Sequence, residues 1–467
     1  MTTEYEVYRE RWLVLASFWV VFFVGGLFWV AFAPISSTVR QEFFPVFNET
    51  LITMLTAGIP LVFVVFAVPA GALVDRKGWK FATSISALIF VAVGFGRALA
   101  TSLEILLAFQ LTLGIAGAFV SSSISKVVTN WFPLREGGFV QGVAILAQFS
   151  GVMLSLMLTP LLTSLMGFKP TLLFYAIVAV LAAVFFFLKA REKPPKPPEE
   201  RVETAAPTVR EGVSRIFRVK DFWILAFAFI ISFGGYLGLT IFIERIIASN
   251  EPFLQKFFEF YIAGNYPLLF QLIITPEQQS FGGLVAGMIT LGGIVGCVII
   301  PRISDRIRRR KPFLILAAIT VIPTLYVLGT MSGSILLIAA FFNGFFLLAS
   351  LPISLEINVE LKDIGPALAG LSVGFLLFFG QMGGVTIPLL MEMIMRNSAS
   401  YLLSTMFYCT TIVTYTSVLG PLALLLTPPP PIPIAGMYLG AIMFLIVLTL
   451  LVLASLTFLT KTGKTNK

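Results

Sequence analysis

Long apolar runs alternate with short polar segments along the whole chain. A helix that crosses a bilayer needs about 20 predominantly apolar residues, and twelve runs come close to that length. They lie at about 12–34, 51–73, 81–100, 102–125, 138–162, 170–188, 222–243, 281–300, 312–330, 334–357, 366–395 and 435–460. This pattern predicts an all-α integral membrane protein that crosses a lipid bilayer twelve times.

A polar segment at residues 189–221 separates the first six runs from the last six. It contains the sequence Lys193-Pro194-Pro195-Lys196-Pro197-Pro198. Proline combined with mixed charge is typical of a stiff, solvated linker without a core of its own. We therefore expect an N-terminal six-helix bundle over residues 1–188, a cytoplasmic linker over 189–221 and a C-terminal six-helix bundle over 222–467.

Two stretches of the second half do not fit a simple six-helix unit. Residues 244–280 carry apolar faces between charges, so we expect short amphipathic helices in an insertion on the outer face. Residues 397–434 are the second expected insertion. Within it, residues 401–426 are long enough to span the bilayer, but a thirteenth span would place the lysine-containing C-terminus outside. We favour a hairpin or re-entrant element here, with a thirteenth span as the alternative.

Composition and charge set the surroundings of the chain. Hydrophobic residues make up 58% of the sequence and charged residues 12%, which excludes a soluble domain. If the N-terminus is cytoplasmic, 26 of the 32 Lys and Arg residues lie in inner segments, and this bias favours a cell-membrane protein with both termini inside. The net charge of +9 is then a topology signal, and we expect no nucleic-acid partner.

The sequence lacks the residues that a metal site, a disulfide framework or a catalytic site would require. The chain has no histidine and only two cysteines, Cys297 and Cys409, so we expect neither a metal site nor a disulfide framework. The sequence also contains no nucleophile motif and no phosphate-binding loop. We therefore expect no catalytic residue, no enzyme activity and no cofactor.

Two charged turns recur once in each half. Asp75 and Arg76 follow one pair of apolar helices, and Asp305 and Arg306 follow another, 230 residues later (305 minus 75). A turn of this form in both halves of a very apolar chain indicates a duplicated bundle whose halves move against one another, as in a transporter. We interpret these four residues as gating residues.

Glu356 and Glu360 lie one helical turn apart at the inner end of the tenth run, near the basic segment 302–311. They are expected to form gate ion pairs or to mark a solvated helix end. A proton-coupling carboxylate is the alternative. It has little support, because no Asp, Glu or His lies deep in the N-terminal half.

Two glutamines occupy matching places in the halves. Gln148 of the fifth run and Gln381 of the eleventh stand 233 residues apart, close to the spacing of the charged turns, and both lie on stripes of small residues. Such repeats bring equivalent positions together near the bilayer midplane, where solutes bind. Lining of a central cavity is the hypothesis, with hydrogen bonding to a neighbouring helix as the plainer alternative.

Two aromatic residues extend this candidate site. Trp29 lies four residues after Gly25, among small residues, and its ring face could hold a cation. An interface anchor or a core filler would explain the same spacing. Tyr236, beside Gly234 and Gly235, is the corresponding aromatic residue in the other half.

The turn at residues 71–80 resembles the signature G-x-x-x-D-R-x-G-R-K/R of the major facilitator superfamily, with Trp79 in place of its arginine. The resemblance extends over the whole chain. It implies a twelve-helix fold of two six-helix bundles around a central cavity, which opens alternately to the two sides.

Within that superfamily the chain is similar to the feline leukaemia virus subgroup C receptor-related family. The segment Tyr8–Leu15 followed by Phe28-Trp29, the segment Glu356–Leu361 and Gln381 carry the likeness. The resemblance implies transport of choline, ethanolamine or a related solute. The family's choline-contacting tryptophan and its cavity glutamines fall on Trp29, Gln148 and Gln381.

One member of the family's site does not match. Its helix-seven tyrosine falls on Leu237 here, and Tyr236 stands one residue earlier, turned by about 100° around the helix. The functional hypothesis is a monomeric secondary transporter or facilitator of a small organic solute, for which the resemblance favours a choline-like cation. Proton-coupled efflux of lipophilic compounds and a solute-sensing membrane receptor are the alternatives.

Overall fold

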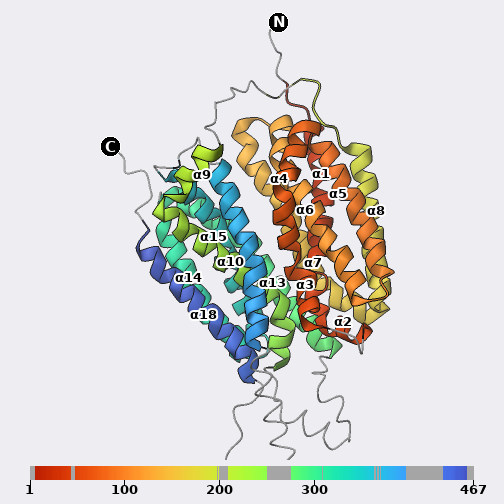
Figure 1. Cartoon of the computed structure of the whole chain (residues 1–467), viewed down its shortest axis with the longest axis vertical. Coiled ribbons are helices and arrows are strands. Elements are labelled where there is room, and N and C mark those ends of the chain that lie inside the picture. The colour runs from red at the N-terminus through yellow and green to blue at the C-terminus, as the bar shows by residue number, and fades with distance from the viewer. Residues whose placement is uncertain are drawn as a thin grey trace, which may run out of the picture.

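The computed structural model describes residues 6–43, 48–196, 198, 209–249, 275–307, 309–361, 364, 368, 370–395 and 435–459. Within these residues every regular element is a helix (Figure 1). Eleven of the helices are long and apolar enough to cross a membrane. The expected all-α membrane fold is therefore confirmed.

The N-terminal half is built from helices joined by short turns. They are α1 (Arg11–Trp29), η1 (Ala33–Ile35), α2 (Ser36–Glu42), α3 (Glu49–Ala57), α4 (Ile59–Lys77), α5 (Trp79–Ala98), α6 (Leu103–Trp131), α7 (Leu134–Met166) and α8 (Phe168–Lys189). The first apolar run does not form one straight helix. α1 stops at Trp29, and Pro34 lies in the short helix that follows.

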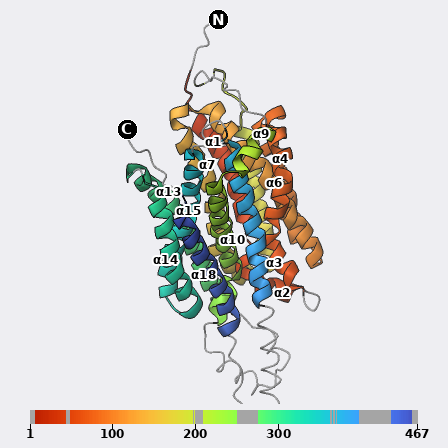
Figure 2. The same ribbon diagram turned by 60° about the vertical axis from the view of Figure 1, so that its left-hand side comes forward.

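The rest of the described chain comprises a short helix in the linker segment, α9, and the helices of the C-terminal half. Its elements are α9 (Val209–Phe217), α10 (Lys220–Ser249), α13 (Pro276–Ile307), α14 (Lys311–Thr330), α15 (Ile335–Glu360), the helix Gly370–Met395 and α18 (Ala435–Thr457). α18 packs along α14 and α10 (Figure 2). Its apolar stretch Ala441–Leu456 falls at the twelfth run of the sequence.

The helices on either side extend into the first expected insertion. α10 continues to Ser249 and α13 begins at Pro276, so both include residues assigned from sequence to the segment 244–280. Residues 250–274 and the segment 396–434, with the question of a thirteenth span, lie outside the described residues. α9 lies within the expected linker.

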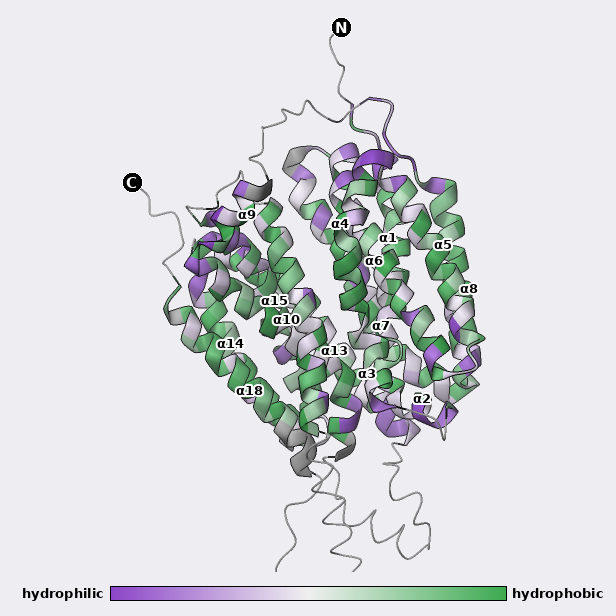
Figure 3. Ribbon diagram, viewed as in Figure 1, coloured by the Kyte–Doolittle hydropathy of each residue, from purple (hydrophilic) through white to green (hydrophobic). Residues whose placement is uncertain are grey.

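Hydropathy divides the bundle into an apolar belt and polar ends. Most helical residues between the two ends are hydrophobic, and hydrophilic residues gather at the ends (Figure 3). We call the end where α1 begins and α9 lies the terminal side, and the opposite end, where α2 lies, the far side (Figure 1). Such a belt matches the hydrocarbon layer of a bilayer.

Glycines permit close helix packing at equivalent places in the two halves. A Cβ atom at Gly26 of α1 would lie 2.0 Å from the carbonyl oxygen of Gln148 in α7. In the other half, a Cβ atom at Gly383 would lie 2.3 Å from the carbonyl oxygen of Ile230 in α10. Backbones that approach this closely fix the helices carrying Gln148 and Gln381 against their neighbours.

Candidate functional site

A cavity lies where the two halves meet. The volume open to the centre of a water molecule is about 60 Å³, well above the roughly 10–15 Å³ that one water needs on this measure. Its lining consists of Phe22, Gly25, Trp29, Ile59, Pro60, Phe63, Phe90, Leu113, Gly117, Val120, Ser121, Gln148 and Gln381. Trp29, Gln148 and Gln381, predicted as one site, therefore share one cavity, and none of the thirteen lining residues is charged.

Trp29 is the last residue of α1 and stands between the halves. Its indole Nε1 donates a hydrogen bond to the carbonyl oxygen of Thr56 at 3.3 Å. Its ring packs on Phe233 of α10, with ring centroids 6.2 Å apart and planes inclined by 41°. The ring contacts the hydrophobic cores of both halves, so its position depends on how the halves are arranged.

The carbonyl groups at the end of α1 are held by two buried side chains. Gln110 Nε2 donates to the carbonyl oxygens of Phe28 and Trp29, both at 3.1 Å. Arg97 Nη1 donates to the Phe28 carbonyl oxygen at 3.2 Å and to Gln110 Oε1 at 3.0 Å. A cation is favourable at a helix C-terminus, where carbonyl groups lack helical partners. This network fixes the position of Trp29.

Sequence reasoning missed this role of Arg97. Its side chain is 1% exposed and lies 4.0 Å above the ring of Phe28. The two bonds from Gln110 join α6 to the end of α1. An arginine in an apolar run of α5 was the available signal, because a charge within a span usually faces the protein interior.

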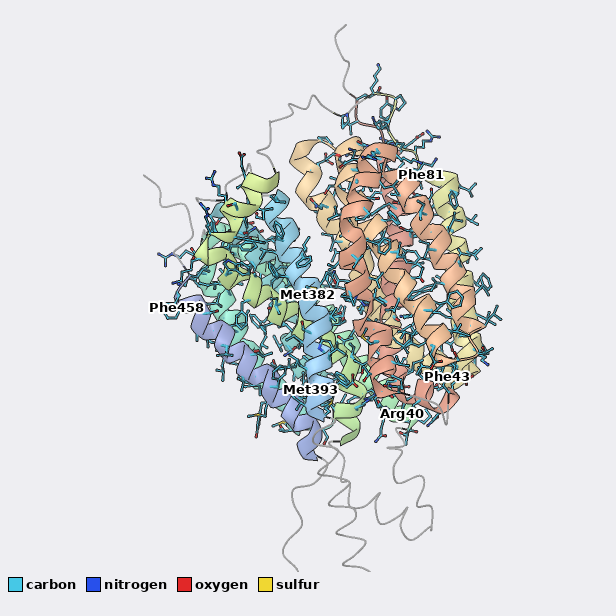
Figure 4. The ribbon with its side chains drawn as sticks, in the orientation of Figure 1. Arg40, Phe43, Phe81, Met382, Met393 and Phe458 are labelled. Atoms are coloured by element: carbon cyan, nitrogen blue, oxygen red, sulfur yellow. The ribbon has the colours of Figure 1, made fainter. Side chains whose placement is uncertain are left out.

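Gln381 offers an unsatisfied polar atom. Its Oε1 atom is buried and has no hydrogen-bond partner, although the residue lines the cavity. Met382, its neighbour in the chain, lies about half way along the bundle (Figure 4). A buried acceptor without a partner is costly, so a donor from a bound solute or water would stabilise it.

Tyr236 lies away from this cavity lining. Its side chain is 3% exposed, and its hydroxyl group is 3.0 Å from Thr290 Oγ1. Thr240 donates to the Tyr236 carbonyl oxygen. The ring therefore belongs to the packed interior of the C-terminal half.

The charged turns of the terminal side form ion pairs within each half. Asp75 accepts from Lys126 at 3.2 Å. Arg310 contacts Asp305 at 2.9 Å and Glu360 at 2.8 Å, and it also pairs with Glu356. The side chains of Arg76 and Arg306 are exposed. Each of these ion pairs therefore stays within one half.

Trp79 stands where the superfamily signature has an arginine, and its side chain is part of the packed interior. The indole is fully buried, between Phe18 and Phe186. The Glu192 carboxylate accepts from the backbone N–H groups of Trp79 at 3.1 Å and Lys80 at 2.8 Å, which are the first residues of α5. An acidic side chain at a helix N-terminus is favourable, so the start of the linker is tied to this turn.

The polar contacts described between the halves concentrate on the far side. Thr50 of α3 donates to Glu392 at 3.0 Å, and Arg245 of α10 pairs with Glu49 of α3 at 3.0 Å. A Cβ atom at Gly283 of α13 would lie 2.3 Å from the carbonyl oxygen of Leu156 in α7. α7 and α13 therefore touch backbone to backbone, which closes the far side.

A family model described as the Major Facilitator Superfamily matches residues 14–250, just over half of the chain. The chain belongs to the Major Facilitator Superfamily. It is therefore a membrane transporter of that type.

Individual relatives are more distant. Solute carrier family 49 member A3 of Xenopus tropicalis is 22% identical over 420 residues, covering 85% of this chain and 80% of that protein. An uncharacterized protein of Archaeoglobus fulgidus is 28% identical over 234 residues, covering 50% of this chain and 92% of that protein. The crystal structure of a bacterial homologue of the human lysosomal transporter Spinster, inward-facing and unoccupied, has a TM-score of 0.68 at 14% identity and covers 97% of each chain. At that identity the likeness concerns the fold.

Proposed function

We propose that this transporter is a secondary carrier or facilitator that moves a small organic cation of the choline type by alternating access. The observation that supports the proposal most strongly is the shared cavity of Trp29, Gln148 and Gln381, in which Gln381 of the C-terminal half joins twelve lining residues of the N-terminal half. A solute held by both halves can be exposed to either side as the halves rock around it.

The chemistry of the cavity fits such a solute. The rings of Phe22, Phe63 and Phe90 join Trp29 in the lining, and a cation over an aromatic face gains about 0.5–2 kcal/mol. The amides of Gln148 and Gln381 would bond the polar tail of the solute. A phosphate or dicarboxylate would require Arg or Lys, which the lining lacks.

One relative supports the family resemblance on which the proposed solute class rests. The solute carrier 49 family, to which one relative belongs by name, is the family of the feline leukaemia virus subgroup C receptors that the sequence resembles. We carry the role of the family's tryptophan and two glutamines to Trp29, Gln148 and Gln381. Tyr236 has no place in the proposed site, because it lies outside the lining.

We assign the terminal side to the cytoplasm and the far side to the outside of a cell membrane, because basic residues are concentrated in the terminal segments. The far-side contacts then correspond to an inward-facing state of a monomer. Asp75, Arg76, Asp305, Arg306, Glu356 and Glu360 are the proposed gating residues of the cytoplasmic side.

Uptake into proteoliposomes tests the substrate and the driving force together. The panel contains choline, ethanolamine, betaine, a dicarboxylate and lipophilic cations, each with and without a pH gradient. The expected result is saturable choline flux that needs no gradient.

The same panel distinguishes the alternative functions. Accumulation of lipophilic compounds only with a proton gradient, lost in Glu356→Gln or Glu360→Gln while counterflow persists, would identify an exporter. Binding of choline without any flux would identify a receptor.

A further inference from the structure

Glu244 is a buried carboxylate at the contact between the halves. It lies in the last turns of α10 and is fully shielded from solvent. Its Oε2 atom accepts from the backbone N–H and the hydroxyl group of Ser36, at 3.1 and 2.8 Å, and its Oε1 atom accepts from the hydroxyl group of Ser37. One side chain of the C-terminal half thus holds the start of α2 in the N-terminal half.

The neighbours of the two serines fix the direction of these hydrogen bonds. Arg245 Nε donates to Ser36 Oγ at 3.3 Å, and Gln279 Nε2 donates to Ser37 Oγ. A hydroxyl group carries a single proton. Because each oxygen already receives a donor, each serine proton is available for Glu244. The carboxylate is therefore surrounded by donors, an arrangement suited to its ionised form.

The charged groups around Glu244 agree with an ionised carboxylate. Arg40 of α2 forms a two-point ion pair with Glu49 of α3, at 2.7 and 3.0 Å, and Arg245 of α10 contacts the same Glu49. Arg40 is labelled at the far side in Figure 4. Two arginines thus lie beside Glu49 and Glu244, and their positive charge favours the ionised form of Glu244. Burial withdraws water from Glu244, and the donors and arginines replace that water.

Among the described residues, one further buried charged group lies at this end. Glu392 of the helix Gly370–Met395, which also packs against α10, is 4% exposed and accepts from Thr50. The remaining described elements packed against α10 add no buried charge here. η1 is apolar, and α13 presents the amide of Gln279, while Glu277 in its first turn is exposed. α18 contains no charged residue. The charged residues of α14 and α15 are Lys311, Glu356 and Glu360, all at the terminal side.

We propose that Glu244 is the latch of the far-side gate: its ionised form closes the gate on Ser36 and Ser37, and a proton on its carboxyl group keeps the gate open. The inference rests on the proposed alternating access. A proton on the carboxyl group would occupy one of the acceptor positions that the Ser36 N–H and the two serine hydroxyl groups fill, and it would remove the negative charge that the nearby arginines favour. When the halves separate, Glu244 becomes accessible to protons from the outer solution.

Distance measurements between two spin labels test the latch without any solute. Thr101 of the N-terminal half and Ser332 of the C-terminal half are exposed at the far side, and both are changed to cysteine after Cys297 and Cys409 are replaced by alanine. In the parent protein the short distance should dominate at pH 8. The ratio of long to short distances should rise about tenfold or more at pH 5.

Three variants complete the test. Glu244→Gln should hold the gate mostly open at both pH values, because an amide cannot accept at every position. Ser37→Ala, which leaves the carboxyl group in place, should raise the pH at which the gate opens. Glu392→Gln is the matched control, since Glu392 is 4% exposed at the same contact and accepts from Thr50, and it should retain the parent pH response.

Two results would overturn the proposal. One is a Glu244→Gln protein with the same pH-dependent opening as the parent, and the other is a parent gate that opens as pH rises. If Glu244→Gln does not fold, an unchanged pH midpoint in Ser37→Ala overturns it equally. These distances do not depend on which solute is carried, so a failure of the choline assignment would leave them intact.

Discussion

Gly283 allows a direct test of the closed far side. A Cβ atom at this position would lie 2.3 Å from the carbonyl oxygen of Leu156 and 2.8 Å from Pro160 Cγ. Both neighbours belong to α7 in the other half, and a backbone oxygen cannot rotate away. Gly283→Ala should therefore push α13 from α7, and the penalty falls on the far-side-closed state alone.

The expected size of the effect follows from the depth of this overlap. Overpacking of a tight interface costs about 1–3 kcal/mol, which corresponds to about a five- to 150-fold change in the ratio of closed to open molecules. Gly287→Ala should have a smaller effect, because its Cβ atom would meet the flexible side chain of Met157. Gly142→Ala is the matched control, since nothing lies within 4 Å of its Cβ position in α7.

The label pair Thr101 and Ser332 measures this series at one pH. The fraction of long distances should rise in the order Gly142→Ala, Gly287→Ala, Gly283→Ala. If Gly283→Ala and Gly142→Ala give the same distribution, the contact between α7 and α13 does not close the far side, and the interpretation of the state is wrong.

Other predictions concern the cavity and the terminal-side gate. Trp29→Ala should weaken binding of a quaternary ammonium by up to about thirtyfold, and Trp29→Phe by less; calorimetry that gives equal affinities for all three proteins would exclude a cation contact. Gln148→Ala and Gln381→Ala should each reduce affinity, with a double variant short of the summed effect if both amides serve one solute group; full additivity would argue for separate roles. Asp75→Asn should favour terminal-side-open molecules, because Asp75 is expected to hold the terminal-side ends of the two halves together in the opposite state; its present ion pair with Lys126 lies within one half, is exposed and contributes only about 0–1 kcal/mol. Unchanged cysteine labelling at that side would contradict a gating role.

The repetitive part of the fold was accessible from sequence. Apolar runs of spanning length predicted the helices, and the recurrence of a charged turn after 230 residues indicated two related halves. The same spacing paired Gln148 with Gln381, and both line one cavity with Trp29. These features depend on local periodicity and on duplication, which a single sequence displays.

Features that depend on distant partners were not accessible. Glu244 was assigned to the outer insertion 244–280, and its partners Ser36 and Ser37 stand more than 200 residues away. The capping of α1 likewise joins Trp29 to Gln110 across 81 residues. Tyr236 is a similar case, since its partner Thr290 stands 54 residues away and the sequence does not show that this ring lies in the interior.

Choline counterflow tests the central claim most directly. Proteoliposomes loaded with unlabelled choline are diluted into trace labelled choline at equal pH and equal ion concentrations on both sides. A carrier that alternates around the cavity of Trp29, Gln148 and Gln381 should accumulate label transiently, and Gln148→Ala combined with Gln381→Ala should reduce that accumulation at low choline. Absence of counterflow for choline and ethanolamine, in a preparation that opens and closes by the distance measurement, would contradict the assignment of this transporter to small organic cations.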